Sequence, residues 1–183
     1  MITVVVTVCL AFAGYAATYL NGLRQSQRQE RLARVNRQLG EFHGPLFALT
    51  EVNSRIFAAF MERNARPDGR SPFAHETPPS EEELAEWRLW VSTVFLPNIR
   101  AMRDLVLRHA DLLSEEEMPP ILLQLSAHVS GYEITAARWE QGSYEQHLSV
   151  VTFPAEELAV YARLRFADLK REQTRLLGGR RRG

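Results

Sequence analysis

Residues 32–60 read LARVNRQLGEFHGPLFALTEVNSRIFAAF, and their apolar side chains recur every three or four positions. This spacing places them on one face of an α-helix, with Asn53 at the one position where the repeat lacks an apolar residue. Pro45 lacks an N–H, and its ring clashes with the carbonyl four residues earlier. We therefore expect a kink or break at Gly44-Pro45, with the same apolar face resuming after it. That face comprises Leu32, Val35, Leu39, Phe42, Leu46, Leu49, Ile56 and Phe60.

A second helix is expected after residues 64–79, a loop rich in proline. Ser80 and Glu83 have the spacing of a capping box, which predicts that the helix begins there. Pro97 should bend this helix rather than end it, because the apolar repeat continues beyond it. The predicted buried face comprises Leu84, Trp87, Val91, Val94, Phe95, Ile99, Met102, Leu105 and Val106.

Two further helices follow in the C-terminal half. Ser114 and Glu117 repeat the capping-box spacing, so we expect a third helix from there to about Gln141. A connector over residues 143–152 could include a short extended stretch. The predicted fourth helix begins at Pro154 and ends at Leu177, before two glycines. The inward positions of the third helix are Leu122, Leu125, Val129, Tyr132, Ala136 and Trp139.

Residues 1–23 (MITVVVTVCLAFAGYAATYLNGL) carry no charged side chain. As a helix, residues 2–20 would be about 28 Å long, close to the roughly 30 Å hydrocarbon thickness of a bilayer. The apolar residues together favour membrane insertion by about 3 to 4 kcal/mol. We therefore expect a single membrane-spanning helix. Its membrane-facing residues are Ile2, Val4, Val5, Val6, Val8, Leu10, Phe12 and Leu20.

Two alternatives for this segment are weaker. A cleaved signal peptide needs a basic start, and no basic residue precedes the apolar run. A lipoprotein modified at Cys9 would have an unsuitable sequence before the cysteine.

Small and weakly polar residues also line one face of the segment at helical spacing, which indicates either self-association or a chance pattern. These residues are Thr3, Thr7, Ala11, Gly14, Thr18 and Asn21.

Orientation follows from the arginines after the span, which only Glu30 offsets. The positive-inside rule places them in the cytoplasm and the N-terminus outside, as in a single-pass protein of the bacterial inner membrane. At the membrane surface they could contact anionic headgroups. They are Arg24, Arg28, Arg31, Arg34 and Arg37.

These patterns predict an all-α fold, with an N-terminal transmembrane helix followed by a cytoplasmic antiparallel bundle of about four helices. The apolar face of residues 32–60 could instead form a parallel coiled coil, but the later helices of the same chain favour a bundle. The expected division is a transmembrane anchor (1–23), a basic juxtamembrane helix (24–40), the bundle (41–178) and a basic tail (179–183). If the helices alternate in direction, the tail returns to the membrane.

The sequence contains few motifs typical of catalysis, cofactor binding or metal binding. With 22 basic and 22 acidic residues the net charge is zero, so we expect no nucleic-acid partner. The chain lacks a Gly-rich phosphate loop, GxSxG, HExxH and paired cysteines, and no histidine follows a glutamate by three positions. We expect no catalytic residue, cofactor or metal site, and the sequence leans against an enzyme without excluding one.

The leading hypothesis is a membrane-tethered, non-enzymatic interaction or scaffold module. Its partners would be the lipid bilayer and either a second copy or another protein. The alternative is a domain that senses a ligand or signal through a cavity between helices. His128, Tyr132 and Trp139 share a helix and could line such a cavity, although a core histidine bonded to a neighbouring group is the simpler interpretation.

Overall fold

The computed structural model describes residues 2–67, 69 and 78–178, with the backbone alone at residues 2–5, 7–9 and 11. The expected loop at 64–79 therefore lies partly outside the described residues. The basic tail after Gly178 and the side chains of Ile2, Val4, Val5 and Val8 lie outside them as well.

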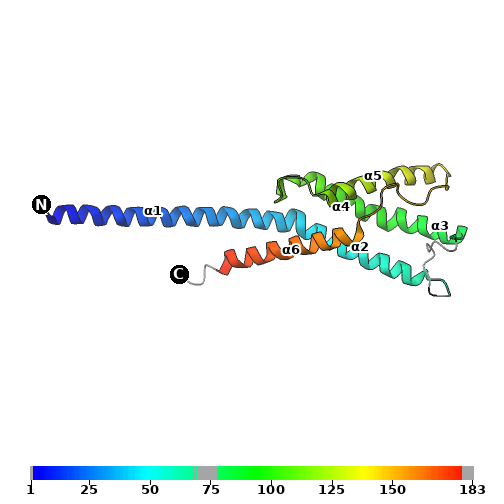
Figure 1. The fold of residues 1–183 in the computed structure, drawn as a ribbon, viewed down its shortest axis with the longest axis horizontal. Helices are drawn as coiled ribbons and strands as arrows, with labels where there is room; N and C mark the ends of the chain where they lie inside the picture. The colour runs from blue at the N-terminus through cyan, green and yellow to red at the C-terminus, as the bar shows by residue number, and fades with distance from the viewer. Residues whose placement is uncertain (1, 68, 70–77, 179–183) are drawn as a thin grey trace.

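The N-terminal third of the chain forms one long kinked helix (Figure 1). It comprises α1 (Ile2–Arg37), the π-helical turn η1 (Gln38–His43) and α2 (Gly44–Arg63). The Gly44 N–H bonds to the carbonyl of Leu39, five residues earlier rather than four. This wider turn accommodates Pro45, which has no N–H to donate. The expected interruption is therefore confirmed, and the apolar face resumes at Leu46, which is fully buried.

The second long helix repeats this arrangement. It comprises α3 (Glu81–Trp90), the π-helical turn η2 (Val91–Phe95) and α4 (Leu96–Arg108). Its continuation through Pro97 is confirmed, with the Leu96 N–H bonded to the carbonyl five residues earlier. The capping box is also confirmed: the Ser80 hydroxyl accepts from the Glu83 N–H, and the Glu83 carboxylate accepts from the Ser80 N–H.

The second predicted capping box is wrong. After a short 3₁₀ turn, η3 (Ala110–Leu112), the chain is irregular up to α5 (Pro120–Glu140). The ring of a proline disfavours helical geometry at the residue before it. Pro120 therefore keeps Pro119 extended, and the helix begins only at Pro120. The Ser114 hydroxyl instead accepts a bond from the Gln38 side chain, 3.0 Å away.

The last helix, α6 (Ala155–Gly178), follows an irregular connector over residues 143–153. No strand forms in the described part of the chain, so the connector contains no paired β-structure. Gly142 ends the preceding helical region in a left-handed conformation, with φ 79°.

The described residues form an all-helical bundle of about four helices that alternate in direction (Figure 1). Helix α2 packs on α4 and α6, and α4 packs on α5. The core contains Phe42, Leu46, Phe60, Trp87, Val91, Phe95, Leu96, Ile99, Met102, Val106, Leu112, Leu113, Leu122, Leu125, Val129, Tyr132, Trp139, Leu158 and Ala162.

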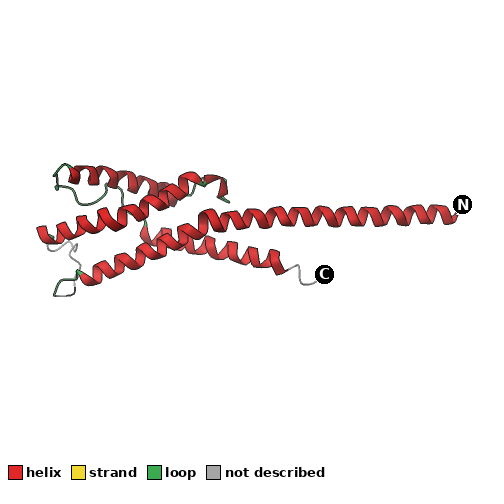
Figure 2. Ribbon diagram, turned by 180° about the vertical axis from the view of Figure 1, so that it is seen from behind, coloured by secondary structure: helices red, strands yellow, loops and turns green. Residues whose placement is uncertain are grey.

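A smaller apolar cluster joins α6 to the C-terminal half of α1. Val35, Leu39 and Leu169 are buried there, with Phe166 and Leu176 packed beside them. Helix α6 thus runs antiparallel to α1, and the start of α1 and the end of α6 lie on the same side of the bundle. Figure 2 shows α1 projecting far beyond the bundle on its own.

Candidate functional site

The projecting part of α1 leaves its large side chains uncovered. Every large apolar or aromatic side chain described between residues 6 and 23 is at least 45 % exposed. Four of the expected membrane-facing residues, Val6, Leu10, Phe12 and Leu20, belong to this set. Among the described residues, no helix combines the length and apolarity needed to cross a membrane.

Three of the five arginines that follow this segment contact the bundle. Arg28 donates from Nε to the carbonyl of Leu176 near the end of α6, at 2.9 Å. Arg31 forms an ion pair with Glu172 at 2.5 Å. These two contacts, with a bond between Gln173 and Asn36, align the end of α6 with the last third of α1.

Arg37 lies where η1 begins, with its guanidinium 3.6 Å from both Glu41 and Asp111. Arg24 and Arg34 are exposed and have no ion-pair partner among the described residues. The structure therefore divides the arginine series into residues that fasten the bundle to α1 and residues whose charge faces solvent.

The three residues suggested for a cavity share one face of α5, and the connector packs on that face. His128 Nδ1 lies 2.5 Å from the Val151 carbonyl. The Tyr132 hydroxyl donates to the His147 carbonyl at 3.1 Å, and Trp139 Nε1 donates to the Gln146 carbonyl at 2.8 Å. All three side chains thus form hydrogen bonds with backbone carbonyls of the connector.

Burial affects the ionisation of this face. It lowers the pKa of His128, partly offset by the bond to the connector, and it raises the pKa of Tyr132. Both groups are therefore held in their neutral forms at neutral pH. Gly131 permits the close packing, since a Cβ there would lie 2.3 Å from the Ser149 hydroxyl oxygen.

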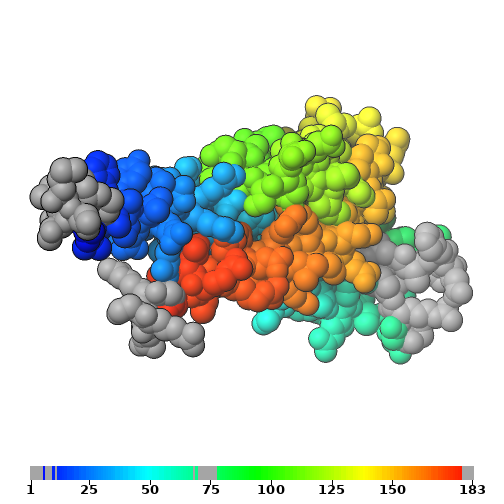
Figure 3. Space-filling view, turned by 60° about the vertical axis from the view of Figure 1, so that its left-hand side comes forward, coloured from blue at the N-terminus to red at the C-terminus, as the bar shows by residue number. Residues whose placement is uncertain are grey.

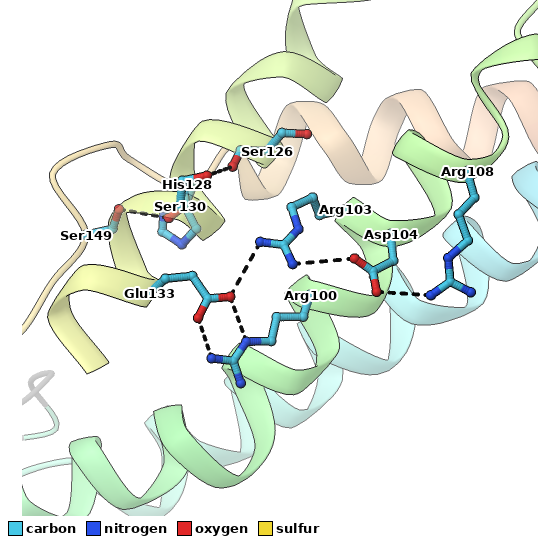
Figure 4. A network of polar contacts seen from close by, with 9 residues as sticks. All are labelled: Arg100, Arg103, Asp104, Arg108, Ser126, His128, Ser130, Glu133 and Ser149. Carbon is cyan, nitrogen blue, oxygen red and sulfur yellow. Dashed lines mark hydrogen bonds and ion pairs between the residues drawn. The ribbon is translucent and has the colours of Figure 1, made fainter. Parts of the chain in front are cut away.

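A charged network crosses the interface between α4 and α5 (Figure 4). Glu133 accepts from Arg100 Nε at 2.8 Å and lies 3.4 Å from an Arg103 nitrogen. The bond from Arg100 lowers the pKa of Glu133, so the carboxylate stays ionised. Glu133 thus faces α4 while His128 bonds to the connector, and the two do not form a shared acid–base pair.

His43 is a buried titratable group in the π turn η1, with 1 % of its surface exposed. Its Nδ1 has no hydrogen-bond partner among the described atoms. Burial lowers the pKa of His43 to about 4; the negative charge of Glu115 opposes this shift, and the positive charge of Arg165 reinforces it. The sequence placed a histidine at the kink, but only the fold shows that it is enclosed.

The described residues include no group of three or more His, Cys, Asp or Glu side chains arranged to hold a metal ion. Comparison of the chain with protein-family models, with curated proteins and with solved structures finds no match.

Proposed function

We propose that the chain is a membrane-tethered, non-enzymatic interaction module of the bacterial inner membrane. In this proposal the N-terminal part of α1 spans the bilayer as a single pass, and the bundle lies in the cytoplasm. The observation that carries the proposal is the run of exposed apolar side chains on the part of α1 that no other element covers.

Exposure of this kind is costly in water. Removing a large apolar side chain fully from water is worth roughly 1.5 to 3 kcal/mol. Residues 6–23 expose seven large apolar or aromatic side chains, each by 45 % or more of its surface. The segment and its flanks also carry no charge from Met1 to Leu23. Hydrocarbon is a suitable solvent for such a surface, and the arginines that follow favour the cytoplasmic side for the bundle.

The interaction role is supported by a second uncovered surface, on α5. One face of α5 packs in the core, yet the opposite face is also free of charge. Its positions follow steps of four and three residues, the spacing of a helix-pairing seam. The exposed residues of this face are Leu123, Ala127, Ser130, Ile134 and Ala137. A helix that is uncharged on two faces is suited to contact a second copy or another protein.

The anchor is tested by matched substitutions. Leu10 and Leu107 are almost equally exposed, at 67 % and 66 %, but only Leu10 lies in the proposed span. An aspartate costs about 3 kcal/mol at the centre of a span, close to the whole insertion preference of this segment. We expect Leu10→Asp to move the chain out of the carbonate-resistant membrane fraction and Leu107→Asp to leave it there.

The interaction role needs a separate experiment. Crosslinking of the full chain in membranes should capture either a dimer or a defined partner protein. Recovery of isolated monomers alone would count against an interaction module while leaving the anchor unaffected. Protease accessibility in spheroplasts checks the orientation, because a cytoplasmic bundle is cleaved only after the membrane is opened.

A further inference from the structure

The end of α6 lies close to the proposed membrane surface. Arg28 follows Leu23 by five residues, about 7.5 Å along a helix. Arg28 also donates to the carbonyl of Leu176, so the last turn of α6 lies at that depth. The polar layer on each side of a bilayer is roughly 5 to 8 Å thick. If the anchor proposed above is correct, on which this step depends, α6 ends within reach of the lipid headgroups.

The surface at this depth is strongly basic. Residues 24–37 and 168–178 together contain eight basic and three acidic side chains. Two ion pairs form within this surface, Asp168 with Arg171 and Glu172 with Arg31, and most of the basic side chains have no acidic partner in them. Arg175 is exposed and has no ion-pair partner among the described residues. Figure 3 shows the end of α6 beside α1, so the charges of the two helices form one surface.

One feature opposes anion binding here. The C-terminal end of a helix carries a partial negative charge, and that end of α6 points toward the membrane. The guanidinium of Arg28 offsets this charge because it donates to the carbonyl of Leu176 in the last turn. Leu177, which is 50 % exposed at the helix end, adds an apolar side chain where headgroups meet hydrocarbon.

We infer that the last two turns of α6, with Arg24 and Arg28 of α1, bind the phosphate headgroups of anionic phospholipids. The bundle is then held against the bilayer at two places, by the span and by the end of α6. The basic side chains of this part of α6 are Lys170, Arg171 and Arg175, of which Arg171 also pairs with Asp168. An arginine near an anionic surface strengthens binding by about five-fold, so the two arginines together contribute up to about thirty-fold.

The experiment uses the full chain reconstituted in vesicles of phosphatidylcholine, with or without phosphatidylglycerol. The measurement is amide hydrogen exchange over residues 170–178. Wild type is compared with Arg171→Gln/Arg175→Gln and with the control Arg55→Gln/Arg63→Gln. The control removes the same charge from α2, which extends away from α1 (Figure 1). The basic tail after Gly178 is identical in all three proteins.

Phosphatidylglycerol should slow exchange at the end of α6 several-fold in wild type and in the α2 control, but not in the α6 variant. High salt should reduce the effect, since exposed charges are screened. Equal exchange in both vesicle types, with the chain still vesicle-bound, would overturn the inference and leave the anchor intact. Slowing that persists in the α6 variant would also overturn it. A chain that does not stay with the vesicles would instead refute the proposed anchor.

Discussion

Protonation of His43 should destabilise the bundle as the pH falls. This side chain is enclosed in the turn where α1 enters the bundle, and its Nδ1 has no partner among the described atoms. Phe42 and Tyr161 supply neighbouring rings, while Glu115 and Arg165 act on it with opposite signs. A charge introduced here would lose its hydration without gaining a dedicated ion pair.

The sign and size of the effect follow from the two pKa values of His43, about 4 in the folded chain and 6.5 in the unfolded chain. The folded state binds fewer protons between these values, so the free energy of unfolding rises with pH across this window. The contribution is fully present above pH 6.5 and is lost as the pH falls toward 4. Going from about pH 7.5 to about pH 4.5 should cost roughly 2 to 3 kcal/mol from this group alone.

The assay is urea unfolding of the full chain in detergent, followed by tryptophan fluorescence. All three tryptophans lie in the bundle, so the signal does not depend on the proposed span. Wild type is compared with His43→Leu, which cannot titrate, at both pH values. Other groups titrate in both proteins, and their effects cancel in the difference. If His43→Leu loses as much stability on acidification as wild type, the assignment to His43 is refuted.

Three further substitutions test the local geometry. Gly44→Ala places a Cβ 2.3 Å from the carbonyl oxygen of Leu39 and should lower the free energy of unfolding by about 1 to 3 kcal/mol in the same urea assay. The control is Gly40→Ala, whose Cβ would have no atom within 4 Å and which should be neutral or slightly stabilising. Ser80→Ala removes the capping box and should cost about 1 kcal/mol, measurable as a lower urea midpoint; an unchanged midpoint would contradict the cap's role. Gly131→Ala crowds Ser149 and should loosen the connector, seen as faster proteolysis within residues 143–153 than in wild type.

The helices could be predicted because their signals are local. Apolar side chains at three- and four-residue steps define each buried face, and Ser80 lies next to the N–H groups that it caps. Both proline kinks follow from the missing N–H and the ring clash, which act within one turn. The error at Ser114 has a local cause too: the extended geometry before Pro120 outweighs the capping-box spacing.

The candidate site was only partly predictable. The uncharged start of α1 and the arginines after it are evident in the sequence, but their partners are not. Arg28 bonds to a backbone carbonyl 148 residues away, and a carbonyl has no residue identity to recognise. The same holds for the connector, whose carbonyls receive the bonds from His128, Tyr132 and Trp139. Glu133 meets Arg100 only because α4 and α5 pack together.

The two π turns affect how the chain tolerates changes in length. A π turn holds one residue more than the α turn that it replaces. Loss of one residue within η1 or η2 would return that turn to α geometry and keep the flanking faces in register. Loss of one residue elsewhere in these helices would rotate every later side chain by about 100° and turn the core face outward. Single-residue deletions between homologues of this chain should therefore gather in the few positions before Pro45 and Pro97.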